Sequence, residues 1–154
     1  MTKKLQGVGA SVLRKEDDRY LRGRGQFVGD IKIPGMLDVA FVRSPIAHGL
    51  IKAIHRPEGF ADRIFTMADL PGVKPIRAVS GLSGFKPSDQ WPLAKDKVRQ
   101  VGELIAACIG PDRACAEDLA QQVFVDFDEL PAVVDPLAAR KNPPSLVHDE
   151  WGDN

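Results

Sequence analysis

"VRQVGELIAACIGPDRACAEDLAQQVFVDFDEL", residues 98–130, carries the clearest structural pattern in the chain. Its apolar run over 104–109 predicts a strand, and Gly110 and Pro111 then predict a helix that begins with proline at its first position. Four apolar side chains follow at the i, i+3, i+4, i+7 spacing of an amphipathic helix: Ala116, Leu119, Ala120 and Val123. Residues 123–130 alternate and predict another strand. A strand, helix and strand in this order favour a sheet covered on one face by the helix, within one α+β domain.

Two segments nearer the N-terminus are also predicted as strands. Residues 36–43, "MLDVAFVR", alternate so that Leu37, Val39 and Phe41 share one face, which predicts a half-buried strand. The chain breaks at Ser44 and Pro45. Residues 49–55 then predict a second strand, which we expect to pair with the first.

The other segments are shorter or irregular. Residues 62–66 predict a short strand, and Thr66 is expected to cap a single helical turn in which Asp69 completes a weak capping box. Prolines, glycines and serines over 74–92 predict a loop. The proline-rich tail, 131–154, is predicted to be extended.

Length and charge narrow the class of protein. The chain has 154 residues, with 21 basic and 21 acidic side chains, which suits one domain with a hydrophobic core. The balanced charge argues against a nucleic-acid binder, because phosphate neutralisation needs a basic surplus. The sequence shows no signal peptide and no apolar run long enough to span a bilayer. We therefore expect a cytoplasmic protein with neither a nucleic-acid nor a membrane partner.

The two cysteines, Cys108 and Cys115, do not form a CxxC pair. We expect both thiols to be reduced and packed, and Cys108 to be inert within its apolar strand. An iron–sulfur centre needs about four thiolates, so this chain cannot hold such a centre alone.

"RYLRGRGQFVGDI", residues 20–32, has three possible meanings: a phosphate-binding loop, a piece of an RNA-binding RGG tract, or a turn that opens a strand. Its glycines lack the GxGxxG spacing of a dinucleotide loop, and no helix is expected after them. A single copy is not an RGG tract. We expect a turn whose arginines are available to a partner surface. The candidate partner-interface residues are Arg19, Arg22, Gly23, Arg24, Gly25 and Phe27.

The remaining polar residues do not form a recognisable catalytic group. His48, His55 and His148 are scattered along the sequence. The run from His148 to Glu150 could suggest a metal site, but adjacent residues of an extended chain point to opposite sides. Glu103 lies in an apolar stretch that could perturb its pKa, although a single acid in a strand is usually hydrogen-bonded or at an edge. We expect no catalytic, cofactor-binding or metal-binding residue in this chain.

Several ordered motifs nevertheless resemble a known family. The pattern G-x-S-x-x-R-x-E-D-x-R-x-L-x-G-x-G-x-F runs from Gly9 to Phe27, and "PGML" and "AFVRSP-x-AH" follow within 34–48. These motifs, with "AEDLAQQVFVDFDELPAVVDP" and "VHDEWGDN" further on, resemble the opening of the large, molybdopterin-binding subunit of the xanthine dehydrogenase and aldehyde oxidase family, particularly its carbon monoxide dehydrogenase type. Leu104 departs from the pattern, because many relatives have proline there.

The resemblance implies an α/β-hammerhead domain, with 1–25 as an N-terminal arm, 26–135 as the hammerhead and 136–154 as an extended tail. It places the cofactor-contacting loops and the catalytic glutamate of the family beyond this chain. The chain is therefore expected to be structural, either as a separate small subunit or as a truncated piece of a molybdenum hydroxylase. Molybdopterin with molybdenum, 2Fe-2S clusters and FAD would lie in partner domains or subunits.

The same resemblance gives expectations for partners and activity. The partners would be the molybdopterin-binding large subunit and the iron–sulfur subunit, and the isolated chain would be inactive and could self-associate through exposed apolar faces. The assembled enzyme would hydroxylate an aldehyde or an N-heterocycle, or oxidise carbon monoxide. Two alternatives stay open: a free-standing protein-binding module with the same fold, and a small catalyst with Glu103 or His148 at a pocket.

Overall fold

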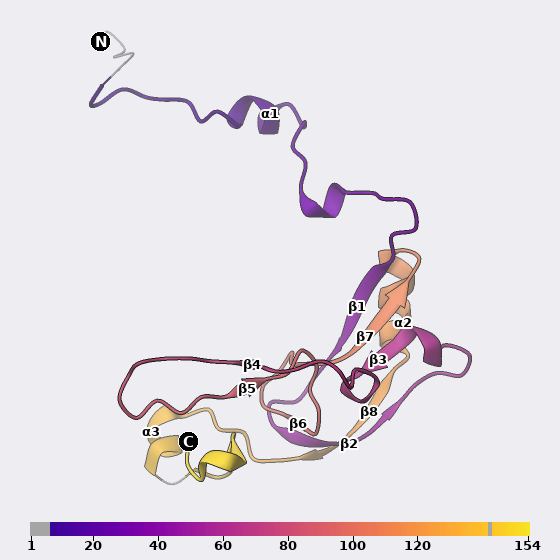
Figure 1. Cartoon of the computed structure of the whole chain (residues 1–154), viewed down its shortest axis with the longest axis vertical. Coiled ribbons are helices and arrows are strands. Elements are labelled where there is room, and N and C mark those ends of the chain that lie inside the picture. The colour runs from indigo at the N-terminus through magenta and orange to yellow at the C-terminus, as the bar shows by residue number, and fades with distance from the viewer. Residues whose placement is uncertain (1–6, 142) are drawn as a thin grey trace. The chain divides into compact units, whose positions relative to one another are not determined.

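The computed structural model describes residues 7–141 and 143–154, and the chain divides between Met36 and Leu37 into two compact units. The N-terminal unit contains the short helix α1 (Asp17–Leu21) and the 3-10 helix η1 (Val28–Asp30). The larger unit contains the strands β1 to β8 and the helices α2 and α3 (Figure 1). This content confirms the predicted α+β class.

The larger unit is built on two three-stranded sheets, and every strand pairing among the described residues is antiparallel. The first sheet has the order β1-β7-β3 and the second the order β6-β2-β8. Their strands are β1 (Asp38–Arg43), β2 (Gly49–His55), β3 (Ile64–Thr66), β6 (Lys97–Val98), β7 (Leu104–Gly110) and β8 (Phe124–Glu129). In place of the one sheet expected from the sequence, the larger unit thus has two separate three-stranded antiparallel sheets.

The predicted pairing of the first two strands is wrong, because β1 and β2 belong to different sheets. Between them the chain turns at Ser44, whose hydroxyl donates to the carbonyl of Ile46 (2.7 Å) and also accepts its amide (3.3 Å). The turn takes β2 out of the sheet of β1. Along its whole length β1 pairs instead with β7, whose nearly continuous apolar sequence suits a central strand.

Helix α2 (Arg113–Gln121) begins two residues after its predicted start at Pro111. The carboxylate of Asp112 accepts the amide of Cys115 (2.8 Å) and caps the helix, so Pro111 lies before the cap and not at the first helical position. The helix packs against β1 and β7. The predicted single sheet of strand, helix and strand is also wrong, because β7 and β8 lie in different sheets.

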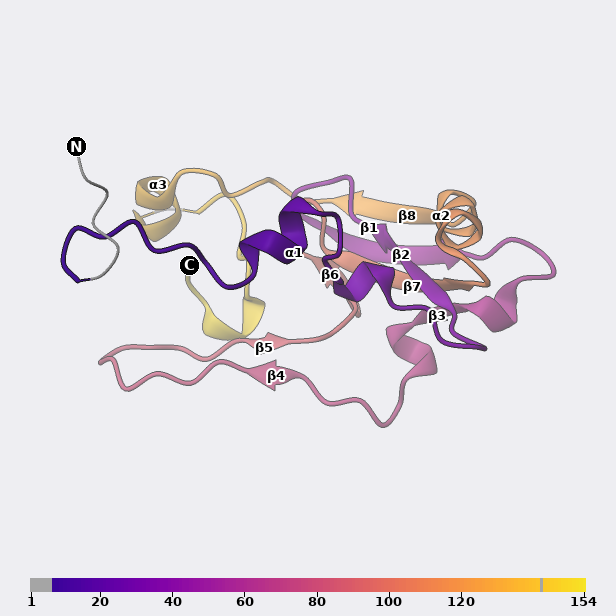
Figure 2. The ribbon, with the colours of Figure 1, turned by 90° about the horizontal axis from the view of Figure 1, so that it is seen from above.

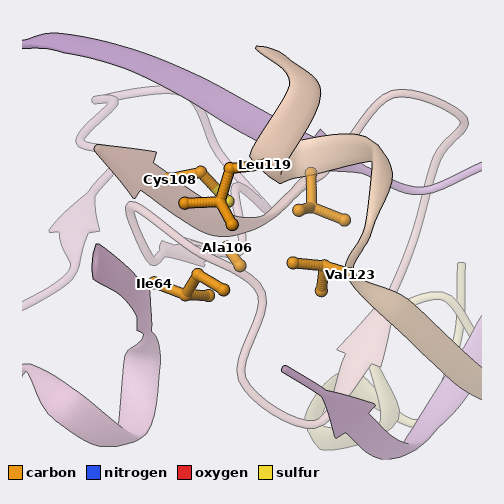
Figure 3. Close-up of a cluster of buried hydrophobic side chains, with 6 residues drawn as sticks. Ile64, Ala106, Cys108, Leu119 and Val123 are labelled. Carbon is orange, nitrogen blue, oxygen red and sulfur yellow. The ribbon is translucent and has the colours of Figure 1, made fainter. Parts of the chain in front are cut away.

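The predicted apolar stripe of α2 is confirmed, and it forms much of the core. Figure 3 shows Leu119 of α2 directed toward Cys108 and Ala106 of β7, with Ile64 of β3 and Val123 nearby. A second buried cluster contains Ala94, Val98 and Ile105. Each fully buried Leu, Ile or Val side chain contributes about 1.5–3 kcal/mol of transfer free energy, so these two clusters hold the sheets and α2 together.

The short strand and the capped turn predicted around Thr66 are confirmed. After β3, the 3-10 helix η3 (Met67–Asp69) follows, and the Asp69 carboxylate accepts the amide (2.7 Å) and the hydroxyl (2.8 Å) of Thr66. Arg56 also donates to this carboxylate. The hydrogen bond from the backbone amide of Thr66 lowers the pKa of Asp69, and the hydrogen bonds from the Thr66 hydroxyl and from Arg56 lower it further.

Two segments expected to be irregular contain some regular structure. The loop 74–92 includes a short antiparallel ladder of β4 (Ile76–Arg77) and β5 (Asp89–Gln90). The C-terminal segment, residues 131–154 where described, includes α3 (Pro136–Lys141) and the 3-10 helix η4 (Asp149–Trp151). The part of this segment around η4 lies beside the β4–β5 hairpin in both views (Figures 1 and 2), and Lys86 donates to the Asp153 carboxylate (2.7 Å). Among the described residues, no helix has the length and apolar character to cross a membrane.

Candidate functional site

The six candidate partner-interface residues all lie in the N-terminal unit, around the turn between α1 and η1. The rings of Tyr20 and Phe27 stack with their centroids 5.7 Å apart, and the guanidinium of Arg19 lies 5.1 Å from the Tyr20 ring centroid. Arg22 pairs with Asp18 at 2.7 Å. These contacts bend the chain so that its basic and aromatic side chains gather around one turn.

The two glycines of this turn are required for different reasons. Gly23 has φ +64°, a left-handed conformation that side chains other than glycine rarely adopt. At Gly25 a Cβ atom would lie 2.9 Å from Cδ1 of Tyr20 and 3.2 Å from the Phe27 ring. The turn expected over 20–32 is therefore present, but the strand expected after it is not. The 3-10 helix η1 follows instead, and the Asp30 carboxylate accepts the amide of Phe27 (2.9 Å).

The described part of the N-terminal unit has no buried helical residue of its own. Large apolar side chains in it are mostly in contact with solvent: Val12, Leu13, Leu21, Val28 and Ile33. The described part of this unit thus exposes apolar side chains of a kind that soluble domains seldom leave uncovered in large patches.

Among the candidate ionisable residues, the structure brings Glu103 and His148 to one cavity of about 810 Å³. The Glu103 carboxylate already accepts the backbone amide of Arg99. The His148 ring stacks on Trp151 (4.2 Å between centroids) and lies 3.4 Å from Glu150. Both side chains are thus engaged in local contacts, and the geometry does not place one as a base for the other.

The other two histidines lie elsewhere. His55 on β2 contacts Asp126 on β8 (2.7 Å), at an exposed cross-strand position. His48 is buried. Residues 149–151 form η4, so the stretch after His148 is helical where it was expected to be extended. Within 7–141 and 143–154, no cluster of histidine, cysteine and acidic residues could hold a metal ion.

The contact between His48 and Ser145 was not predicted from the sequence. The hydroxyl of Ser145 lies 3.0 Å from Nδ1 of His48, although the residues are 97 positions apart. The same hydroxyl donates to the carbonyl of Pro131 at 2.6 Å, and the Nδ1 atom lies 3.0 Å from that carbonyl. A serine whose proton points to a carbonyl is not activated by the imidazole. The group ties the C-terminal segment to the turn before β2.

Lys97 and Arg99 also form hydrogen bonds that hold the C-terminal segment in place, and neither residue was identified as a contact from the sequence. Lys97 is buried, and its ammonium donates to the Asp149 carboxylate (2.8 Å) and to the carbonyl of Leu146 (2.7 Å). The Arg99 guanidinium donates to the carbonyl of Val147 (3.1 Å). The hydrogen bond from Lys97 lowers the pKa of Asp149. No local spacing could reveal these contacts, because about fifty residues separate the partners.

The cysteines differ from each other. Cys108 is buried as predicted, and burial raises the pKa of its thiol. Cys115 was expected to be packed but is exposed on the first turn of α2. Its hydrogen bond with the Asp112 carboxylate raises the pKa of this thiol. Both thiols are therefore weak nucleophiles at neutral pH.

Comparison with known proteins links this geometry to one group. The family described as "Aldehyde oxidase and xanthine dehydrogenase, a/b hammerhead domain" matches residues 22–131. The carbon monoxide dehydrogenase large chain of Hydrogenophaga pseudoflava is 35% identical over 95% of this chain and 18% of its own length. The nicotine 6-hydroxylase large subunit of Paenarthrobacter nicotinovorans is 34% identical over 96% of this chain and 18% of its own length.

The solved structures agree with the sequence comparison. The crystal structure of quinoline 2-oxidoreductase from Pseudomonas putida 86 matches with a TM-score of 0.85 and 37% identity, over 99% of this chain and 20% of that chain. The present chain thus spans about a fifth of the length of the proteins that it matches.

Proposed function

The chain belongs to the aldehyde oxidase and xanthine dehydrogenase family through its a/b hammerhead domain, and on that premise we propose that it is a docking domain of a molybdenum hydroxylase. It would complete the molybdopterin-binding large subunit, as part of that subunit or as a separate small one, and contact the iron–sulfur subunit. We place it in the cytoplasm, in keeping with its two free cysteines.

One observation carries this proposal. The hammerhead match occupies residues 22–131, while the chain corresponds to only 18% of the length of its relatives. A domain that accounts for a fifth of a large enzyme normally presents surfaces to the other four fifths. The exposed apolar side chains of the N-terminal unit and of β1 are surfaces of this kind.

We infer that the cofactors of the family are held outside this chain. An iron–sulfur cluster needs about four thiolates, and the chain has two cysteines, one of which is buried. In the cavity of Glu103 and His148, Lys97 and Arg99 could attract an anionic group, but both already bond to the C-terminal segment. We therefore place molybdopterin, the 2Fe-2S clusters and FAD in the partner domains or subunits, together with the reaction itself.

The substrate of the assembled enzyme would be an aldehyde, an N-heterocycle or carbon monoxide. The relatives include a nicotine hydroxylase, a quinoline oxidoreductase and carbon monoxide dehydrogenases. The oxygen atom added to an organic substrate would come from water, and the cofactors of the partner domains or subunits would supply the redox chemistry. The present chain would contribute positioning and interface, without a catalytic group.

Size fractionation of an extract from the native cell tests the proposal. The chain, detected by antibody, is expected in fractions far above its own 16.8 kDa. These fractions should contain molybdenum and reduce an artificial electron acceptor with quinoline, nicotine or carbon monoxide. The purified 154-residue chain should not reduce the acceptor. Elution of all the chain at its own mass, without molybdenum, would contradict the proposal and favour a free-standing binding module.

A further inference from the structure

Strand β1 has one unpaired edge. It is the first strand in the order β1-β7-β3, and within the described residues its backbone pairs with β7 alone. In an antiparallel pair every second residue directs its amide and carbonyl away from the partner. The outer edge of β1 therefore presents free hydrogen-bonding groups. Strand β8 is likewise the last strand of the order β6-β2-β8.

A cavity of about 810 Å³ runs along this edge of β1. All six residues of β1 line it, from both faces of the strand, so it follows the edge and does not lie over one face. Helix α2 forms one wall of the cavity, with Arg113, Glu117, Ala120 and Gln121. Strand β8 forms the other wall, with Phe124, Val125 and Phe127. An added strand at this position would lie between the two sheets, beside α2.

The lining mixes apolar and polar side chains, and its charges are balanced. Val39, Phe41 and Phe124 are 48%, 41% and 64% exposed. Two acidic and two basic side chains stand around them, Asp38 and Glu117 against Arg43 and Arg113. Arg113 pairs with Glu117 (2.6 Å), and Arg43 donates to the carbonyl of Gly102 (3.0 Å). An occupant without net charge, in extended conformation, fits this groove best.

The centre of β1 lacks the features that protect an edge strand against pairing, and its two charged side chains, Asp38 and Arg43, lie at its ends. Edge strands of soluble proteins commonly carry lysine, proline or a bulge that prevents strand addition. The sequence of β1, "DVAFVR", has no lysine or proline, and the register shift with β7 lies at its end, between Val42 and Arg43. An unprotected edge beside exposed apolar side chains indicates a strand that is covered in the working protein.

We propose that this groove takes an extended apolar segment from the molybdenum-binding remainder of the large subunit, which adds to β1 as a fourth strand. The inference rests on the proposed function and names the mode of contact. Two facts favour this occupant. The relatives carry about four fifths of their length outside the matched region, and the neutral groove complements an apolar strand. Backbone pairing would supply affinity, and the pockets around Phe41 and Phe124 would supply selectivity.

The test uses the full 154-residue chain and synthetic peptides. Overlapping 15-residue peptides would cover the part of the Hydrogenophaga pseudoflava carbon monoxide dehydrogenase large chain that lies outside the match. The strongest binder is then measured in solution against the parent chain, Phe41→Asp and the control Val79→Asp, whose residue lies outside both three-stranded sheets. We expect Phe41→Asp to weaken binding at least about tenfold and the control to change it less than about twofold.

Two further measurements keep the result interpretable. Phe41→Thr retains a strand-forming residue and is expected to weaken binding while leaving thermal unfolding unchanged. Hydrogen exchange of the β1 amides should slow when the peptide binds. Equal binding by the parent and Phe41→Asp, or no binding by any peptide, would overturn the strand-addition model.

The chain could also form a dimer that the Phe41→Asp substitution abolishes. That result would overturn the strand-addition model too, because a second copy of the chain would then occupy the edge of β1. Peptide binding at another surface would overturn the groove assignment but leave the proposed function standing. The proposed function itself fails only if the fractionation of native extracts finds no complex.

Discussion

At Gly110 the last residue of β7 meets the first turn of α2 at very short range. A Cβ atom there would lie 2.6 Å from the amide nitrogen of Ala116 and 2.9 Å from the carbonyl oxygen of Asp112. Both are backbone atoms, so the helix would have to move as a whole. The absence of a side chain at this one residue allows α2 to lie so close to the sheet.

We therefore expect Gly110→Ala to lower the free energy of unfolding by about 1–3 kcal/mol, as overpacked sites do. Urea denaturation followed by circular dichroism measures the change. Gly72→Ala is the matched control, because nothing lies within 4 Å of the added carbon there, and its effect should stay within about 0.5 kcal/mol. Equal stability of the two variants would contradict the close approach of helix and strand.

Gly25 has a comparable role in the N-terminal turn, where a Cβ would press against Tyr20 and Phe27. Gly25→Ala is expected to separate the two stacked rings. Because Tyr20 is the single tyrosine of the chain, its ring protons can be followed by NMR, and they should lose the ring-current shift from Phe27. Gly29→Ala, with open space around the added carbon, should leave the shifts unchanged. Identical spectra for the two variants would show that the rings do not need Gly25.

At the scale of elements, the packing of α2 depends on a few residues of its apolar stripe. Leu119 is buried against Ala106 and Cys108 of β7. Leu119→Ala should lower the free energy of unfolding by about 2–5 kcal/mol, through lost transfer energy and the cavity left behind. The exposed Leu137 of α3 offers a control, and Leu137→Ala should change stability by less than about 0.5 kcal/mol. A similar loss in both variants would contradict the assigned core.

The C-terminal segment is held by a contact that depends on pH. The ammonium of Lys97 lowers the pKa of Asp149 from its ordinary value of 3.8. A carboxyl group whose pKa is lowered on folding stabilises the folded state at pH values above its ordinary pKa. This stabilisation is lost as the pH falls through the lower pKa of the folded state. Below about pH 4 the segment is therefore expected to loosen.

Fluorescence of Trp151 in η4 reports this change once the other tryptophan is replaced by Trp91→Phe. The signal should change between pH 4 and lower values in this background. Adding Asp149→Asn should remove the transition. A transition of the same size and midpoint in both proteins would show that Asp149 does not hold the segment.

The elements that local sequence predicts are those whose interactions are local. The apolar spacing of α2 and the Thr66–Asp69 turn are visible in the local sequence, and both were predicted correctly. The pairing of β1 with β7 in place of β2 was not predicted, because it depends on the turn at Ser44 and joins strands whose paired residues are about 60 to 70 positions apart. Lys97 and Ser145 were missed for the same reason. For the candidate interface, the sequence indicated the arginine and glycine turn but not the Tyr20–Phe27 stack.

At the scale of the whole molecule, the larger unit has a core and the described N-terminal unit does not. The chain amounts to about a fifth of its relatives, and large apolar side chains are exposed in both units. A soluble domain that leaves this much apolar surface uncovered is typically part of a larger assembly.

Purification of the tagged chain from its native cell, with cross-linking, mass spectrometry and molybdenum analysis of the eluate, shows whether the chain works within such an assembly. We expect a cofactor-binding large-subunit polypeptide to elute with the chain, together with an equimolar amount of molybdenum. Cross-links should join that polypeptide to residues of the N-terminal unit. Elution of the chain alone and free of molybdenum would show that it is not part of a molybdenum hydroxylase.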